Sequence, residues 1–270
     1  MNSTQPKEYE ILPPDNTPVW RYISLAKLLA LLRTKSVFFC RADQFDDVFE
    51  GAFTEGSLRE HAEQWGGEYP ESVIQLCSWL PSRSFVSCWH AANVESAALW
   101  KIYAGVEGSL AIQSTVGALK KTFPSILEKK GDDLIVSQDV RRVQYIDYLT
   151  EHPFINDLAG PLCYKRQAFS FEQEIRVIRQ ELPSISKPSP ERPNGRAINL
   201  ATPPAEVGRE IEVNLDELIE KVYLAPSSPA WLLPTVRAAM ERFGFTTIEC
   251  RQSRLDELPA FGRLSSRLGM

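Results

Sequence analysis

Two glutamates separated by one residue are the clearest candidates for chemistry in this sequence. Glu172 and Glu174 lead into the run at 175–178, which is rich in β-branched residues and typical of a strand. Side chains at i and i+2 of a strand share a face, so the two carboxylates and Arg176 should project together. Close carboxylates repel, and a protein usually keeps such a pair where a cation neutralises it or the pair has a use. Two interpretations stay open: an acid pair that does chemistry, or a solvated strand start neutralised by Arg176 or Arg179.

An aromatic pair is the second candidate. Trp100 and Tyr103 stand three residues apart in the stretch NVESAALWKIYAG, a spacing that places them on one face of a helix. We predict that Asn93 caps this helix and that Gly105 ends it. A helix that packs aromatic side chains onto a sheet accounts for the pattern. The alternative is that Tyr103 borders a pocket and stacks on a flat ring.

An acidic loop with two aromatic residues is the third candidate. The stretch FDDVFE at 45–50 carries three carboxylates, and their spacing does not match an EF-hand loop. We expect Phe45 and Phe49 to be buried anchors, while the acids hold backbone amides or a cation such as Arg41. These acids are Asp46, Asp47 and Glu50. No bound metal is expected.

Composition and missing motifs exclude several classes of function. The 270 residues carry 30 Lys and Arg against 35 Asp and Glu, a net charge of −5, which gives no basic footprint for non-specific binding to duplex DNA. No apolar run approaches the ~18 residues of a membrane span, and the N-terminus lacks the apolar centre of a secretory signal. Five cysteines at irregular spacing and three scattered histidines disfavour a zinc site or a disulfide framework. We therefore expect a cytoplasmic protein with reduced cysteines.

Motifs of common nucleotide-binding and hydrolytic sites are also missing. The sequence has no G-x-x-x-x-G-K-[ST], no G-x-G-x-x-G and no G-x-S-x-G, which disfavours P-loop, Rossmann and α/β-hydrolase sites. Ser87 and His90 lie close in sequence, but residues i and i+3 of a strand point to opposite faces. A Ser–His nucleophile pair built from these two is not expected.

The order of predicted elements indicates an α+β fold whose core is a mixed, largely antiparallel sheet flanked by helices. Strands are predicted at 19–23, 36–40, 84–89, 109–113, 140–146, 169–180, 209–213, 222–225 and 246–250. Helices are predicted at 25–35 after an N-cap at Ser24, and at 57–80, 93–105, 115–123, 153–160, 214–220 and 228–243. Residues 1–18 should form an extended arm, 19–250 a single domain, and 251–270 a polar tail. The Pro-rich stretch 183–208 is expected to be a flexible insertion, either a lid or a disordered loop.

These motifs, in this order, resemble a bacterial domain of unknown function, family 2971, which includes proteins associated with abortive phage infection. The matching segments are Trp20-Arg21-Tyr22 before a Leu-rich helix, FDDVFE at 45–50, Val86-Ser87-Cys88-Trp89, Trp100 to Gly108, and Lys165 with Phe171 to Val177. The resemblance spans roughly residues 18–250. The chain departs from the family pattern at Asp46, Val48 and Phe169, where the family has Asn, Pro and Trp.

An Arg on a first strand, a Ser on a middle strand and E-x-E entering a later strand is similar to the order of the R-S-E ADP-ribosyltransferases. This resemblance implies an ADP-ribosyltransferase-like fold with NAD as the substrate. Arg21 would bind the pyrophosphate through its planar fork, and Ser87 would hold the ribose or orient Glu174. Glu174 would stabilise the oxocarbenium-like ribose formed as nicotinamide leaves, and Glu172 would deprotonate or position the acceptor.

Aromatic residues complete the site that the resemblance implies. Tyr22, Trp100 and Tyr103 join Arg21 as the expected NAD-binding set, with Tyr103 stacking on the nicotinamide ring. The implied function is that of an NAD-dependent ADP-ribosyltransferase-like or NAD-hydrolysing bacterial protein, in phage defence or a toxin system. Its acceptor would be a macromolecule, either protein or nucleic acid, and no membrane partner is expected.

A non-catalytic binding or sensor protein of a defence system is the alternative. The acidic loop and the Pro-rich insertion would then contact a partner, and the E-x-E strand would be a ladder of ion pairs. An enzyme of the R-S-E kind needs Arg21, Ser87 and Glu174 to converge on one cleft, whereas a binding protein does not. A nuclease is a third option, because the acids of the 45–50 loop are clustered, and it would require Mg²⁺.

Overall fold

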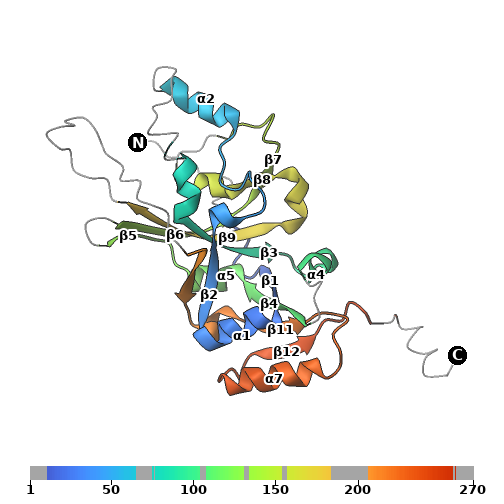
Figure 1. Ribbon diagram of the computed structural model, residues 1–270. Coiled ribbons are helices and arrows are strands. Elements are labelled where there is room, and N and C mark those ends of the chain that lie inside the picture. Colours follow the sequence, from blue (N-terminus) through green and yellow to red (C-terminus); the bar gives the residue numbers. More distant parts are fainter. Residues whose placement is uncertain are drawn as a thin grey trace.

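A ten-stranded sheet forms the centre of the molecule, with helices packed against it (Figure 1). The computed structural model describes residues 11–64, 75, 77–103, 108–130, 134–153, 157–183, 206–257 and 259. Within these ranges, no helix is long and apolar enough to cross a bilayer.

The main sheet contains strands from the whole described length of the chain. They are β1 (Pro18–Ser24), β2 (Ser36–Arg41), β3 (Ser84–Ala91), β4 (Ser109–Thr115), β5 (Ile126–Lys130), β6 (Leu134–Arg142), β9 (Glu174–Pro183), β10 (Gly208–Glu212), β11 (Lys221–Leu224) and β12 (Glu249–Gln252). Two further strands, β7 (Gln144–Ile146) and β8 (Tyr164–Arg166), pair with each other in parallel.

Strand order brings distant parts of the chain side by side. The order across the sheet is β12-β11-β4-β1-β3-β9-β6-β5, and β2 pairs with both β3 and β10. Neighbouring strands are antiparallel except β11 and β12, which are parallel. The predicted α+β fold with a mixed, largely antiparallel sheet is confirmed. Because β3 lies between β1 and β9, the three strands on which the candidate residues were placed are neighbours.

Helices and short 3₁₀ turns connect the strands. The α-helices are α1 (Leu25–Thr34), α2 (Glu55–Gln64), α4 (Ala97–Tyr103), α5 (Val116–Thr122), α6 (Leu215–Leu218) and α7 (Leu232–Arg242). The 3₁₀ turns are η2 (Ala42–Gln44), η3 (Leu80–Arg83), η4 (Gly160–Cys163) and η5 (Gln167–Glu172).

Polar side chains fix where several helices begin. Ser24, Thr115 and Asn214 each accept a hydrogen bond from a backbone N–H of the first turn that follows. Such a bond satisfies a donor that the helix itself leaves unpaired. The predicted cap at Ser24 is confirmed, and α1 ends at Thr34, followed by Lys35 as the C-cap in a left-handed conformation with φ 51°.

The two faces of the sheet bury different sets of side chains. One face packs against α1, α5, α6 and α7, and its core includes Phe85, Trp89 and Val177. The other face carries Val86 and Ile178 among a second cluster, which is covered by the segment from β7 to η4. Alternation along β3 and β9 sends neighbouring residues to opposite faces, so each candidate side chain belongs to one face only.

Several predicted elements differ from the structure. The strand predicted at 140–146 is broken after Arg142, because Arg142 pairs with Ile175 and β9 begins only one residue earlier. The helix predicted from Asn93 begins at Ala97, and the Ser96 hydroxyl accepts the Leu99 N–H at 3.3 Å, so Ser96 rather than Asn93 acts as the cap.

Other expectations fall partly outside the described residues. These are part of the arm predicted at 1–18, part of the helix at 57–80, the helix end at Gly105, part of the helix at 153–160, most of the insertion at 183–208, and most of the tail at 251–270. Strand β5 was not predicted. Strand β12 continues to Gln252, two residues into the predicted polar tail.

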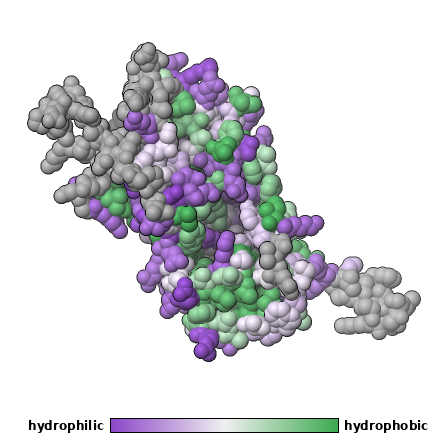
Figure 2. Space-filling model, viewed as in Figure 1, coloured by the Kyte–Doolittle hydropathy of each residue, from purple (hydrophilic) through white to green (hydrophobic). Residues whose placement is uncertain are grey.

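The surface seen in Figure 2 has two parts. Hydrophilic and hydrophobic residues are mixed over the upper part, and hydrophobic residues gather at the lower end of the view, where α1 and α7 lie in Figure 1. These two helices bury Leu28, Leu31 and Leu32 from α1 and Leu232, Val236 and Met240 from α7.

Candidate functional site

The register between β3 and β9 determines which residues meet. Glu174 lies directly opposite His90, and Arg176 lies opposite Cys88. Directly opposite residues of an antiparallel pair share a face. Between η5 and β9, Gln173 takes a left-handed conformation with φ 42°. This turn carries Glu172 back toward Glu174, so the predicted meeting of the two acids is confirmed, through a turn rather than a regular strand.

Two cations join the acid pair. The Nζ atom of Lys165 lies 2.5 Å from Glu172 Oε2 and 2.8 Å from Glu174 Oε1. The Nε atom of Arg176 lies 2.5 Å from the other oxygen of Glu174. Glu174 therefore contacts two cations, whereas Lys165 is the only cation that contacts Glu172 among the described residues.

Glu50 from the acidic loop completes the cluster. Its two carboxylate oxygens accept hydrogen bonds from Arg176 Nη1 at 2.7 Å and Nη2 at 3.0 Å. One of these oxygens also lies 3.2 Å from Lys165 Nζ. We call these five groups the acid network: Glu50, Lys165, Glu172, Glu174 and Arg176.

The acid network is buried and carries unbalanced charge. Its members are all buried side chains, and Arg176 is only 1% exposed. Aromatic rings lie over the two cations, with Lys165 Nζ 4.7 Å from the Phe169 ring centre and Arg176 Cζ 5.7 Å from that of Phe45. With all groups ionised, three carboxylates face two cations. An uncompensated buried charge is unfavourable, so protonation of one carboxyl group, which balances the charges, is favoured.

Glu172 is the carboxyl group that takes up this proton. Burial alone would raise the pKa of Glu174, but Arg176 and Lys165 outweigh it and hold that pKa well below the ordinary value. Burial and the neighbouring Glu174 raise the pKa of Glu172 to about 7, against the opposing effect of Lys165. The two adjacent carboxyl groups therefore differ in protonation near neutral pH.

Two side chains link Glu172 to its surroundings. The Tyr103 hydroxyl donates to Glu172 Oε1 at 3.2 Å, and the Tyr103 side chain is 50% exposed. The Nδ1 atom of His90 lies 2.6 Å from the main-chain oxygen of Glu172. A carbonyl only accepts, so Nδ1 carries the proton and Nε2 is left as an acceptor. Burial lowers the pKa of His90, which favours this neutral form.

Tyr22 and Trp100 lie on the same face and pack together. Their ring centres are 5.0 Å apart in an edge-on arrangement. The hydroxyl of Tyr22 accepts the Ser96 N–H at 2.7 Å, and the Trp100 indole N–H donates to Glu95 at 2.7 Å. Both therefore anchor α4, from which Tyr103 reaches the acid network.

Arg21 and Ser87 lie on the opposite face of the sheet from Glu174, so the structure does not bring the three expected residues together. Ser87 pairs with Val177, and its fully buried hydroxyl accepts from Trp89 Nε1 at 3.1 Å. Arg21 donates to the Phe38 oxygen at 2.8 Å, and its guanidinium carbon lies 5.7 Å from the centre of the Trp89 ring. Both residues support the side of the sheet that packs against α1.

The acidic loop differs from the prediction in its cations and in its aromatic residues, because Phe45 and Phe49 are half-buried and not fully buried anchors. Asp47 accepts the Phe49 N–H at 3.1 Å, as expected of an acid that holds a backbone amide. The cation of Asp47 is Arg166, at 2.9 Å, whereas Arg41 pairs with Asp43 at 2.6 Å. Phe49 is half-buried and packs edge-on against Tyr148, with ring centres 5.1 Å apart.

Sequence reasoning missed three members of this site. Lys165 stood only in the family motif, Glu50 was assigned to its own loop, and His90 was considered only with Ser87. The signal for His90 was strand alternation, since His90 and Cys88 share a face that Ser87 does not. Nothing local in the sequence marks Glu50 as a partner of Arg176, because the two are 126 residues apart.

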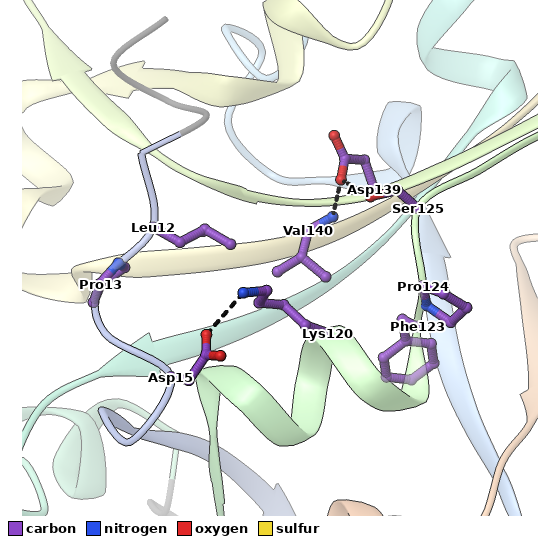
Figure 3. A pocket seen from close by; sticks show the side chains of 9 residues that line it. All are labelled: Leu12, Pro13, Asp15, Lys120, Phe123, Pro124, Ser125, Asp139 and Val140. Atoms are coloured by element: carbon purple, nitrogen blue, oxygen red, sulfur yellow. Dashed lines mark hydrogen bonds and ion pairs between the residues drawn. The ribbon is translucent and has the colours of Figure 1, made fainter. Parts of the chain in front are cut away.

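Two surface cavities have no member of the acid network in their lining. One, of about 580 Å³, is lined by residues of the N-terminal segment, α5 and β6, and the Lys120 side chain reaches toward Asp15 across it (Figure 3). The other, of about 400 Å³, is lined by Phe49, Phe53 and Tyr148 with residues of α2. Within the described part of the chain, no group of three or more His, Cys, Asp or Glu side chains is arranged to hold a metal ion.

Comparison with known proteins gives weak similarities only. No family model matches the chain, so membership of the domain family of unknown function is not confirmed, and no curated protein matches its sequence. The chain is similar to Thermus sp. 2.9 DarT in complex with carba-NAD⁺, with 13% identity, a TM-score of 0.38, and 90% of this chain and 98% of that chain covered. The same protein in complex with ADP-ribosylated ssDNA gives 13% identity and a TM-score of 0.38, with 90% and 96% covered. Its complex with NAD⁺ gives 12% identity and a TM-score of 0.37, with 88% of this chain and 96% of that chain covered. At these values the similarity assigns neither a family nor an activity to this chain.

Proposed function

We propose that this chain breaks the bond between nicotinamide and ribose in NAD and passes the ADP-ribosyl group to water or to a macromolecular acceptor. The proposal is carried by one observation: Glu172 and Glu174 meet at Lys165 Nζ, but only Glu174 also bonds to Arg176. This arrangement drives the pKa values of the two carboxyl groups in opposite directions. Neighbouring carboxyl groups whose surroundings drive their pKa values apart are how enzymes divide acid and base roles between two like residues. Cleavage of a glycosidic bond uses such a pair.

Glu172 is the reacting carboxyl group in this proposal. The bond from C1′ of the ribose to the pyridinium nitrogen breaks, its electron pair stays on that nitrogen, and neutral nicotinamide leaves. An oxygen of water or of the acceptor then bonds to C1′, and its proton passes to the Glu172 carboxylate. A pKa of about 7 suits a base that works near neutral pH. The half-exposed ring of Tyr103, bonded to Glu172, offers a face for the nicotinamide.

Glu174 and His90 are positioning residues. Glu174 is bonded through both oxygens to Lys165 and Arg176, so it fixes the cation that in turn holds Glu172. His90 ties the main chain at Glu172 to β3. This changes the division of roles expected from the sequence, in which Glu174 itself faced the ribose.

A binding or sensor protein without catalytic activity is the second candidate. The observation that favours it is the placement of Arg21 and Ser87 on the face opposite Glu174. In that case the acid network stabilises the fold and holds the acidic loop, and the protein recognises a partner through its surface. A part in phage defence or in a toxin system is compatible with either candidate and is proposed on the sequence resemblance alone.

The decisive experiment measures nicotinamide release from NAD by chromatography, with water, protein and single-stranded DNA offered as acceptors. We expect release by the natural chain and its loss in Glu172→Gln. Glu55→Gln is the matched control, since the Glu55 side chain is 76% exposed and pairs only with Arg59 among the described residues. If the folded natural chain neither releases nicotinamide nor binds NAD in calorimetry, the binding-protein candidate replaces the enzyme.

A further inference from the structure

Glu50 belongs to the acid network but has no part in the proposed chemistry. It comes from the loop after β2, whereas the two other acids flank Gln173 between η5 and β9. The contact is firm, because Arg176 donates to both oxygens of Glu50, at 2.7 and 3.0 Å. The Glu50 side chain is 5% exposed. A charged group so deeply buried is seldom kept without a partner or a use.

Glu50 draws on both cations of the network. Arg176 offers two of its nitrogens to Glu50 and one to Glu174, and Lys165 is shared among all three carboxylates. With Glu50 ionised, two positive charges face three negative ones. Without the Glu50 charge, two positive charges would face two negative ones, and Lys165 would be shared by Glu172 and Glu174 only.

We propose that Glu50 is a positioning residue which, by occupying Arg176 and drawing on Lys165, leaves Glu172 as the proton-exchanging carboxyl group of the site. This inference rests on the proposed function of Glu172 and adds to it a residue from a different part of the chain. The acidic loop thereby influences the proton affinity of Glu172 indirectly, through the contacts of Glu50 with Lys165 and Arg176.

Three of the groups around Glu172 bring no charge to it. Tyr103 from α4 donates to Glu172, and His90 from β3 is neutral and binds the main-chain oxygen. Tyr145 from β7 accepts the Glu174 N–H at 2.8 Å and is an uncharged phenol at neutral pH. The charges that face Glu172 are therefore Lys165 from β8 and Glu174 and Arg176 from β9, together with Glu50 from the loop.

The test follows the titration of Glu172 itself. Carbon-13 NMR of protein labelled at the glutamate side-chain carboxyls gives each titration midpoint, and the Glu172 signal is identified by its loss in Glu172→Gln. We expect the Glu172 midpoint to fall in Glu50→Gln by about one pH unit or more, because the variant removes a like charge that shares Lys165 with Glu172. Asp47→Asn removes a charge from the same loop outside the network and should leave the midpoint in place. An unchanged midpoint in folded Glu50→Gln overturns the proposal.

A second variant decides the case where Glu50→Gln does not fold. Glu50→Asp keeps the charge, so Glu172 should still titrate well above an ordinary glutamate, and an ordinary midpoint would overturn the proposal. The NMR readout needs no catalysis, so absence of nicotinamide release would count against the proposed function and not against this inference. If release is present, its pH profile should shift to lower pH in Glu50→Gln, in step with the Glu172 midpoint.

Discussion

The carboxyl groups of Glu172 and Glu174 meet at one ammonium group, lying 2.5 and 2.8 Å from Lys165 Nζ, but their pKa values are shifted in opposite directions. The difference comes from a second cation. Arg176 bonds to Glu174 and not to Glu172, so Glu174 stays ionised while Glu172 exchanges its proton near neutral pH. Two residues of one type, with one residue between them, are thereby given different properties.

Glu172→Gln should abolish nicotinamide release while the protein stays folded. The substitution is nearly isosteric, and the amide still accepts from Lys165, but it cannot take up a proton. Single-turnover assays with near-ultraviolet circular dichroism on the same samples check both parts. Release at the natural rate from the folded variant would exclude Glu172 as the base.

Glu174→Gln should lower the free energy of unfolding by about 3–5 kcal/mol, the usual result of removing one partner of a buried ion pair. A solvated pair, one of the two interpretations that the sequence left open, would give a far smaller effect, but Glu174 is buried between Lys165 and Arg176. Urea denaturation measures the difference, with Glu55→Gln as the exposed control. A loss as small as that of the control would mean that the network does not hold the fold together.

The pH dependence of stability should carry the signature of Glu172. Its pKa rises from an ordinary 4.5 to about 7 on folding, so the folded state binds this proton more tightly than the unfolded state. The contribution is complete below the unfolded-state value and is lost as pH rises toward the folded-state value. The unfolding free energy should therefore contain a component that falls between these two pH values and is missing in Glu172→Gln.

Glu174 should affect the pH dependence of stability in the opposite direction. Its pKa is lowered on folding, so its contribution is present above the ordinary glutamate range and is lost in strong acid as pH falls through the folded-state value. Denaturation curves across the acid range separate the two glutamates. Parallel pH profiles for the natural chain and Glu172→Gln would contradict the raised pKa of Glu172.

Ser87→Ala should destabilise the fold by about 1–3 kcal/mol, because the buried indole N–H of Trp89 loses its acceptor. Thermal unfolding followed by calorimetry measures the loss. Ser87→Thr, which keeps the hydroxyl, is the matched variant for separating the hydrogen bond from packing. If Ser87→Ala instead left stability unchanged and raised the KM for NAD, the ribose-binding role expected from the sequence would be restored.

Phe49→Ala should lower the free energy of unfolding by less than the loss for a fully buried aromatic residue, which is about 3–5 kcal/mol. The reason is that Phe49 is half-buried against Tyr148. Asp47→Asn should lower the free energy of unfolding by still less. Added Mg²⁺ or Ca²⁺ should leave the melting curves of both variants unchanged. Differential scanning calorimetry with and without each ion checks this. A metal-dependent rise in Tm that disappears in Asp47→Asn would favour the nuclease interpretation.

The sequence alone determined the features that depend on neighbours along the chain. Ser24 caps α1 because its hydroxyl reaches the N–H three residues on, and the closeness of Glu172 and Glu174 in sequence predicted that their carboxylates meet. Hydrophobic alternation likewise predicted most strands and, through them, the class of the fold. Such features follow from local geometry, which the spacing of residue types expresses directly.

Only the tertiary structure decided which distant side chains join the acid pair. Strand register is set by packing across the whole sheet, and a shift of one residue sends every side chain to the other face. That register turned His90 toward Glu174 and turned Arg21 and Ser87 away. Glu50 reaches Arg176 for the same kind of reason, because loop and strand are brought together by folding and not by any pattern in the intervening sequence.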